Sequence, residues 1–174
     1  GILMLVGINV TLAVSLNLAT GYLGQLTLGH AGFMAVGAYV SALLSMYANL
    51  PFVLTLVIGA VAAGFIGLLI GVPILRLKGD YLCIITLAFN EIIRVIIVNL
   101  SITNGSKGLI GTPSDTTFLA VYLVAVITIF VVYSIVHSRH GRAIISIRED
   151  ETAAELSGIN ITYYKILAFV ISAL

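Results

Sequence analysis

The chain has 174 residues, of which 60% are hydrophobic and 9% are charged, and its formal net charge is +1. An ordinary soluble domain carries charge on about a quarter of its residues. The composition therefore excludes a soluble fold and indicates that the lipid bilayer is the solvent. Because no basic patch interleaved with aromatic residues is present, we predict no nucleic-acid partner.

Few side chains are suited to catalysis, metal binding or disulfide formation. Cys83 is the single cysteine, which excludes an internal disulfide and a cysteine pair on a metal. No convergent nucleophile and base and no metal-binding cluster is visible, so we predict that the chain is not an enzyme and holds no cofactor. It begins without Met or a basic leader and stops inside an apolar run. We therefore expect a piece of a longer protein, cut at both ends.

Residues 1–19 are about long enough to cross a bilayer, which takes roughly 20 residues. Residues 20–31 then combine three glycines with Gln25 and His30, which predicts an irregular or broken segment. Two interpretations stay open: a discontinuous element lining a transport pathway, or a plain cytoplasmic turn with close-packed glycines. We interpret His30 as a hydrogen-bonded structural group, because no second ligand is placed to share a metal.

Two further apolar spans follow, at residues 32–48 and 51–75. The second carries a small residue every four positions, a spacing that predicts a face for close helix packing. These residues are Gly59, Ala63, Gly67 and Gly71. A tight polar turn is expected at residues 76–80.

The fourth span, residues 81–99, contains two ionisable residues near its middle. Glu91 and Arg94 are three residues apart and therefore share one helical face. Ionisable groups at that depth are costly and mark functional sites by default, so we predict an ion pair. It serves either to hold this helix to its neighbours or in gating and the pathway, and Asn90 suits both arrangements.

Residues 100–116 form a polar loop that lacks the phosphate-loop pattern, so no nucleotide site is predicted. Residues 117–136 are a fifth, uncharged span. Because the spans cross the membrane in alternating directions, the basic residues of the loops fall on two sides. Lys107 lies on one side, and the other side carries Arg76, Lys78, Arg139, Arg142 and Arg148. The positive-inside rule makes the side with five basic residues cytoplasmic.

A charged segment at residues 137–160 separates the fifth span from the start of a sixth at 159–174. We expect a basic turn at 138–141, followed by a short helix. Asp150 can cap that helix, with acidic residues in its first turn, and Gly158 can end it. A charged, helix-forming insert between two spans predicts contact with a soluble partner on the cytoplasmic side.

The short helix resembles a known motif. Thr-Ala-Ala-Glu-Leu-Ser-Gly at 152–158 resembles the EAA loop of permease subunits of bacterial ABC importers, where a coupling helix docks into a groove of the ATPase. The family's opening Glu is Thr152 here, with Glu151 just before it. The resemblance implies ATPase coupling through Asp150, Glu151, Ala153, Ala154, Glu155 and Gly158.

Two longer stretches are similar to one branch of that family. Residues 21–39 and 77–94 look like the signature blocks of branched-chain amino-acid permeases of the LivM/LivH type, closer to LivM. Together with residues 148–170, the similarity covers nearly the whole chain. Related urea permeases share the architecture.

The resemblance implies an all-α, polytopic transmembrane helical bundle with a short cytoplasmic coupling helix. Residues 1–174 would form a partial permease domain of five spans and the start of a sixth, multi-pass in the bacterial inner membrane. Implied partners are ABC ATPase subunits, a second homologous permease subunit and a periplasmic or lipid-anchored substrate-binding protein.

Transport would proceed by alternating access, powered by the ATPase. An apolar pathway is expected along residues 20–39 and 81–99. The candidates for pathway or gating roles are Gln25, His30, Asn90, Glu91 and Arg94. The alternatives are an ABC permease for urea or another small polar solute, or an ion-coupled secondary transporter that uses Glu91, Arg94 and His30.

Overall fold

The computed structural model describes residues 1–48, 51–74, 80–103, 108–109 and 116–174, and these residues form helices and connecting segments without a strand. The turn predicted at 76–80 and Lys107 lie outside the described residues, apart from the backbone of Asp80. The elements are α1 Ile2–Asn17, η1 Leu18–Tyr22, α2 His30–Ala48, α3 Phe52–Ile74, α4 Asp80–Asn99, η2 Ser101–Thr103, α5 Phe118–His137, α6 Arg139–Glu149, α7 Glu151–Leu156 and α8 Ile161–Ala173.

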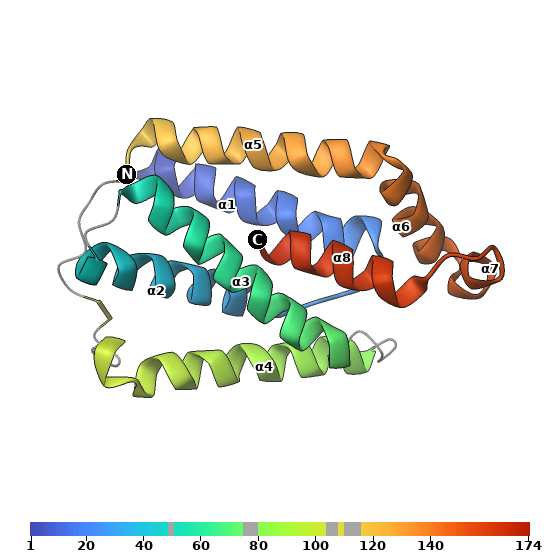
Figure 1. Cartoon of the computed structure of the whole chain (residues 1–174), viewed down its shortest axis with the longest axis horizontal. Helices are drawn as coiled ribbons and strands as arrows, with labels where there is room; N and C mark the ends of the chain where they lie inside the picture. The colour runs from blue at the N-terminus through green and yellow to red at the C-terminus, as the bar shows by residue number, and fades with distance from the viewer. Residues whose placement is uncertain (49–50, 75–79, 104–107, 110–115) are drawn as a thin grey trace.

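Five of these helices are long and apolar enough to cross a membrane, at Ile2–Tyr22, His30–Ala48, Phe52–Ile74, Tyr81–Asn99 and Phe118–His137. They run along the long axis of the molecule (Figure 1). Large apolar side chains such as Phe65 and Phe130 project from their outer faces, 63% and 67% exposed. Such a surface suits lipid or another membrane protein, and the predicted all-α polytopic bundle is confirmed.

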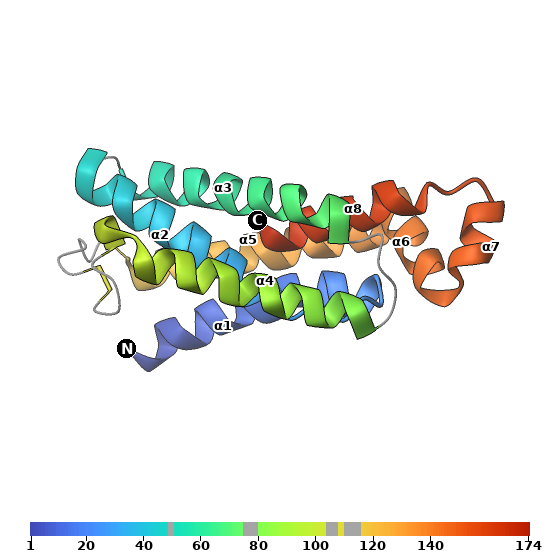
Figure 2. The same cartoon turned by 90° about the horizontal axis from the view of Figure 1, so that it is seen from below.

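The helices α6 and α7 lie together at one end of the bundle, beyond the end of α5, in both views (Figures 1 and 2). From there α8 turns back and ends near the middle of the molecule. Arg139, Arg142 and Arg148 all belong to α6, so these three basic residues lie at this end.

The small-residue face of α3 is buried as predicted. A Cβ added to Gly59 would lie 2.7 Å from the backbone oxygen of Gly37 in α2, and one added to Gly67 would lie 2.9 Å from the Cβ of Ala173 in α8. Because glycine has no side chain, the three backbones approach closely here. The face therefore packs on two helices, α2 at one end and α8 at the other.

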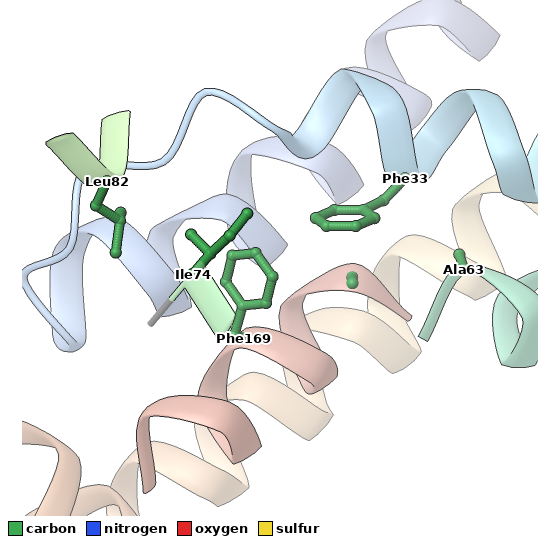
Figure 3. Packing of buried hydrophobic residues seen from close by; sticks show 6 residues of the cluster. Phe33, Ala63, Ile74, Leu82 and Phe169 are labelled. Atoms are coloured by element: carbon green, nitrogen blue, oxygen red, sulfur yellow. The ribbon is translucent and has the colours of Figure 1, made fainter. Parts of the chain in front are cut away.

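The central core joins four helices. Phe33 of α2 meets Phe169 of α8 edge to face, with ring centroids 5.4 Å apart and an interplanar angle of 86°. Ala63 and Ile74 of α3, Leu82 of α4 and Ala173 of α8 complete the cluster, most of which Figure 3 labels. Aromatic pairs in this geometry contribute about 1 kcal/mol beyond area burial. The core fixes α8 against the first half of α2.

Candidate coupling helix and membrane pathway

The predicted basic turn at 138–141 is wrong, because α6 begins at Arg139. The hydroxyl of Ser138 accepts a hydrogen bond from the amide of Gly141 at 3.3 Å and caps the helix. Three apolar side chains of α6 then face the bundle and are buried: Ala143, Ile144 and Ile147. Capping and this apolar face together convert the expected turn into a helix that carries α7.

A single residue separates α6 from α7. Asp150 has extended backbone angles, φ −156° and ψ 110°, and its Oδ1 accepts hydrogen bonds from the amides of Thr152 and Ala153 at 2.8 and 3.1 Å. The acidic cap also suits the positive end of the helix dipole. The N-cap predicted at Asp150 is present, and it sets the direction in which α7 leaves α6.

Gly158 ends α7, as the sequence predicts. The amide of Gly158 donates to the carbonyl of Glu155 at 2.9 Å, and that of Ile159 donates to Ala154 at 3.1 Å. These two bonds make a Schellman motif, whose turn residue adopts a left-handed backbone. The φ of Gly158 is +83°, a conformation that favours glycine.

We expect Gly158→Val to destabilise this turn by about 1–2 kcal/mol, because a β-branched residue is strained at positive φ. Nothing lies within 4 Å of an added Cβ, so the penalty comes from the backbone alone. Gly158→Asn should therefore lose less stability, because asparagine tolerates this conformation. Thermal inactivation of the two variants checks the prediction, and equal losses would contradict it.

The two predicted alanines of α7 face opposite ways. Ala154 is 4% exposed and packs in a cluster with Leu23, Ile144, Ile147 and Ala168. Ala153 is exposed, and Leu156, three residues further on, is 85% exposed. Residues three apart share a helical face. The outward face of α7 therefore presents Ala153 and Leu156, whereas Ala154 fixes the helix to the bundle.

Sequence reasoning missed Leu156 and assigned Glu151 to the ATPase. The Oε1 of Glu151 accepts a hydrogen bond from Nζ of Lys165 in α8 at 2.5 Å, and the Glu151 side chain is 32% exposed. Lys165 is 3% exposed. A cation in an apolar helix could have indicated an acidic partner, but nothing in the sequence placed that partner in α7.

The broken segment predicted at residues 20–31 is confirmed. The π-helical turn η1 continues α1 to Tyr22, an extended stretch follows, and α2 begins only at His30. Figure 1 shows this stretch leading from the α6 end of the bundle to a start of α2 part way along it. Leu23 and Thr27 are 2% and 3% exposed. Leu26 and Leu28 are 64% and 48% exposed, so the described residues cover only one side of this segment.

The end of the bundle that carries α6 and α7 contacts this segment directly. The guanidinium of Arg148, at the end of α6, donates from Nη1 to the carbonyl of Gly21 at 3.0 Å. Gly24 has a φ of +74°, and an added Cβ would lie 2.6 Å from Cγ of Arg148. Leu23 packs in the same cluster as Ala154. Helices α6 and α7 therefore contact the broken segment directly, without an intermediate element.

Helix α4 contacts the later part of the broken segment at residues 20–31. The hydroxyl of Thr86, 2% exposed, accepts from the amide of Leu28 at 3.1 Å. Asn90, one turn later, lies against Gly32, where an added Cβ would be 3.1 Å from its Oδ1. Thr86 was missed by sequence reasoning, although a threonine four residues before Asn90 in an apolar span was an available indication.

His30 anchors the start of α2. Its Nε2 hydrogen-bonds the carbonyl oxygen of Ser172 in α8 at 3.1 Å, the kind of bond expected of a structural histidine. Three buried side-chain atoms of this region have no hydrogen-bond partner among the described residues: Oε1 of Gln25, Oγ1 of Thr27 and Nδ1 of His30. Buried polar atoms are nearly always paired with protein or water, so these atoms remain available to water or a solute.

Glu91 and Arg94 form the predicted ion pair, with Nη1 and Oε2 3.3 Å apart. Their side chains are 53% and 73% exposed. Arg94 follows Asn90 by four residues, so the pair borders Asn90 on the surface of α4. Within the described part of the chain, it does not hold α4 to a neighbouring helix.

Two further features bear on cofactors and ligands. An apolar hollow of about 240 Å³ lies between α1, α3 and α5 and is lined by residues such as Leu12, Leu56 and Val124. None of the predicted pathway residues lines it. In the described ranges, no three His, Cys, Asp or Glu side chains are grouped to hold a metal ion.

Comparison with known proteins identifies relatives of the whole chain. The family model for the permease component of the branched-chain amino acid transport system matches residues 1–174. The high-affinity branched-chain amino acid transport system permease protein LivM of Salmonella typhimurium is 35% identical over 95% of this chain, and that of Escherichia coli K12 is 36% identical over 95%. The chain spans 47% of each relative's length. No solved structure matches.

Proposed function

Since this chain belongs to the family of branched-chain amino acid transport permease components, we propose that its full-length protein is the membrane-spanning permease subunit of an ABC importer. The solutes are branched-chain or other aliphatic amino acids, and the location is the bacterial inner membrane. The observation that carries the proposal is α7, a capped helix at one end of a transmembrane bundle with Leu156 85% exposed.

The outward face of α7 is the part that meets the ATPase. Thr152, Ala153, Glu155 and Leu156 are exposed there. An apolar side chain flanked by small and polar residues suits insertion into a groove of a soluble subunit. Two ATPase subunits, a second permease subunit and a substrate-binding protein complete the assembly. ATP-driven movement of the ATPase displaces α7, and the packed end of the bundle follows.

The pathway runs beside the broken segment. Gln25, Thr27 and His30 contribute buried polar atoms without partners among the described residues, and Asn90 packs close by on Gly32. An amino acid needs a few polar contacts within a mostly apolar passage, and this combination supplies both. Displacement of the segment by α6 and α7 would change access to these groups, which is the step that alternating access requires.

A crosslinking experiment tests the docking face. A cysteine at Leu156 in a full-length, Cys83-replaced background is expected to crosslink to a co-expressed ABC ATPase in a nucleotide-dependent manner. The matched control is a cysteine at Ala154, whose side chain is 4% exposed and should crosslink poorly. Equal crosslinking at the two positions, or none at either, would contradict the proposed face.

Transport measurements separate the alternatives. Uptake of leucine by the reconstituted complex should require ATP and should be unaffected by collapse of the proton gradient. Leucine uptake that follows the gradient would favour the ion-coupled transporter. Competition by urea but not by valine would favour a permease for small polar solutes.

The Glu91–Arg94 pair provides a further prediction. A charged pair on an exposed face near the middle of a span is costly in lipid, so we propose that protein or the aqueous pathway covers this face in the assembly. Arg94→Ala leaves the carboxylate alone and should lower the amount of assembled complex or its uptake about tenfold or more. Arg94→Ala combined with Glu91→Ala should recover part of the loss, because no lone charge remains. A double variant as impaired as the single would contradict this.

A further inference from the structure

A buried cation connects α8 to α7. Lys165 lies in the first half of α8 and is 3% exposed. An ammonium group is strongly destabilised away from water unless an anion accompanies it. That anion is the carboxylate of Glu151, the first residue of α7, at 2.5 Å. The pair joins the helix at the cytoplasmic end to a helix that enters the bundle.

The other end of α8 is joined to the pathway. The carbonyl of Ser172 accepts the hydrogen bond from His30, the first residue of α2. Lys165, Ala168 and Ser172 are spaced by three and four residues and therefore share a face of α8. Ala168 is fully buried, in the cluster that contains Leu23 and Ala154. Seven residues of helix cover about 10 Å, so one rigid element links α7 to the broken segment.

The pair is suited to transmit movement. A six-residue helix such as α7 is too short to be stable alone and depends on its contacts. The Lys165 side chain is 4% exposed and that of Glu151 is 32% exposed, and a partly buried ion pair is screened less by salt than a surface pair. Separating the two charges would leave Lys165 buried without compensation. Displacement of α7 is therefore opposed unless α8 moves with it.

We propose that Glu151 and Lys165 are positioning residues through which α7 moves α8, and that α8 passes this movement to the start of α2 through Ser172 and His30. The inference rests on the proposed function, because it requires an ATPase that displaces α7. It reassigns Glu151 from the docking face to the internal linkage. A physical pathway of this kind needs evidence of energetic coupling, which the following experiment supplies.

The full-length protein is reconstituted with its ATPase and permease partners, and amino-acid uptake and ATP hydrolysis are measured together. Glu151→Gln and Lys165→Met are each expected to lower the uptake per ATP hydrolysed about tenfold, with ATP hydrolysis and complex assembly retained. Exchanging the charges, Glu151→Lys with Lys165→Glu, should recover most of this ratio. Arg139→Gln is the control, because it removes an exposed charge at the start of α6 that takes no part in the Glu151–Lys165 link, and it should leave the ratio unchanged.

Several results would overturn the proposal. Single variants that keep the normal ratio would show that the pair does not couple the helices. If the single variants do not accumulate in the membrane, the variant with exchanged charges decides. The ionic link is not the transmitting element if that variant accumulates without recovering the uptake per ATP, or if it recovers neither accumulation nor uptake per ATP. ATP-independent uptake by the unchanged protein would refute the proposed function itself, which distinguishes the two failures.

A double variant tests the step from α8 to α2. If His30 and Lys165 act along one path, His30→Ala with Lys165→Met should lower the ratio no further than the more impaired single variant. Losses that multiply would show that His30 acts independently, and would overturn this step.

Discussion

Leu156→Asp should abolish amino-acid uptake by the full-length transporter while leaving the permease folded in the membrane. Leu156 is 85% exposed on α7, so the substitution disturbs no internal packing. On the proposed function, its side chain enters an apolar groove of the ATPase, where a carboxylate would lose hydration without gaining a partner. We expect at least tenfold less ATPase recovered with the purified permease and a corresponding loss of uptake.

Ala153→Asp should act in the same way, because Ala153 shares the exposed face. Ala154→Asp should behave differently: it would place a charge in the cluster around Leu23 and Ile144 and destabilise the permease by about 3 kcal/mol or more. Thermal inactivation of the detergent-solubilised protein separates the two mechanisms. If Leu156→Asp and Ala153→Asp lowered thermal stability as much as Ala154→Asp, the outward face of α7 would be assigned wrongly.

Gly141→Ala should be the most damaging glycine-to-alanine change among the glycines that the structure describes. Gly141 lies at the corner between α5 and α6, and an added Cβ would overlap the carbonyl oxygens of Ile135 and Val136. These are backbone atoms of the last turn of α5, so no side-chain rotation relieves the overlap. The corner must open, and we expect a loss of stability of about 3 kcal/mol together with loss of uptake, because α6 and α7 move with it.

Gly37→Ala is the matched control for this substitution. It also adds one methyl group to a helical glycine, but the nearest atom to the new Cβ is 3.4 Å away, an ordinary contact distance. Alanine is the better helix former by about 1 kcal/mol, which offsets minor crowding. A thermal midpoint for Gly141→Ala that equals that of Gly37→Ala would show that the corner tolerates a Cβ.

Local chemistry determined much of this protein from the sequence. Apolar runs of about twenty residues specify membrane spans because each span must satisfy its backbone internally and offer lipid an apolar surface. The cap at Asp150 and the turn at Gly158 act within four residues of themselves, so both were predictable. The prediction of a basic turn at 138–141 was wrong because the apolar face of α6 is stable only against the bundle.

Only the tertiary structure decided which groups meet. Arg148 bonds the carbonyl of Gly21 across 127 positions of sequence, and His30 bonds that of Ser172 across 142. The different exposure of Ala153 and Ala154, and the pairing of Glu151 with Lys165, likewise depend on where α6 and α8 lie. Helical periodicity predicts which residues share a face of a helix, but only packing between distant segments determines which residues that face contacts. The short capped helix α7 could therefore be predicted from the sequence, whereas the contacts that α8 makes with α7 and with the start of α2 appear only in the folded chain.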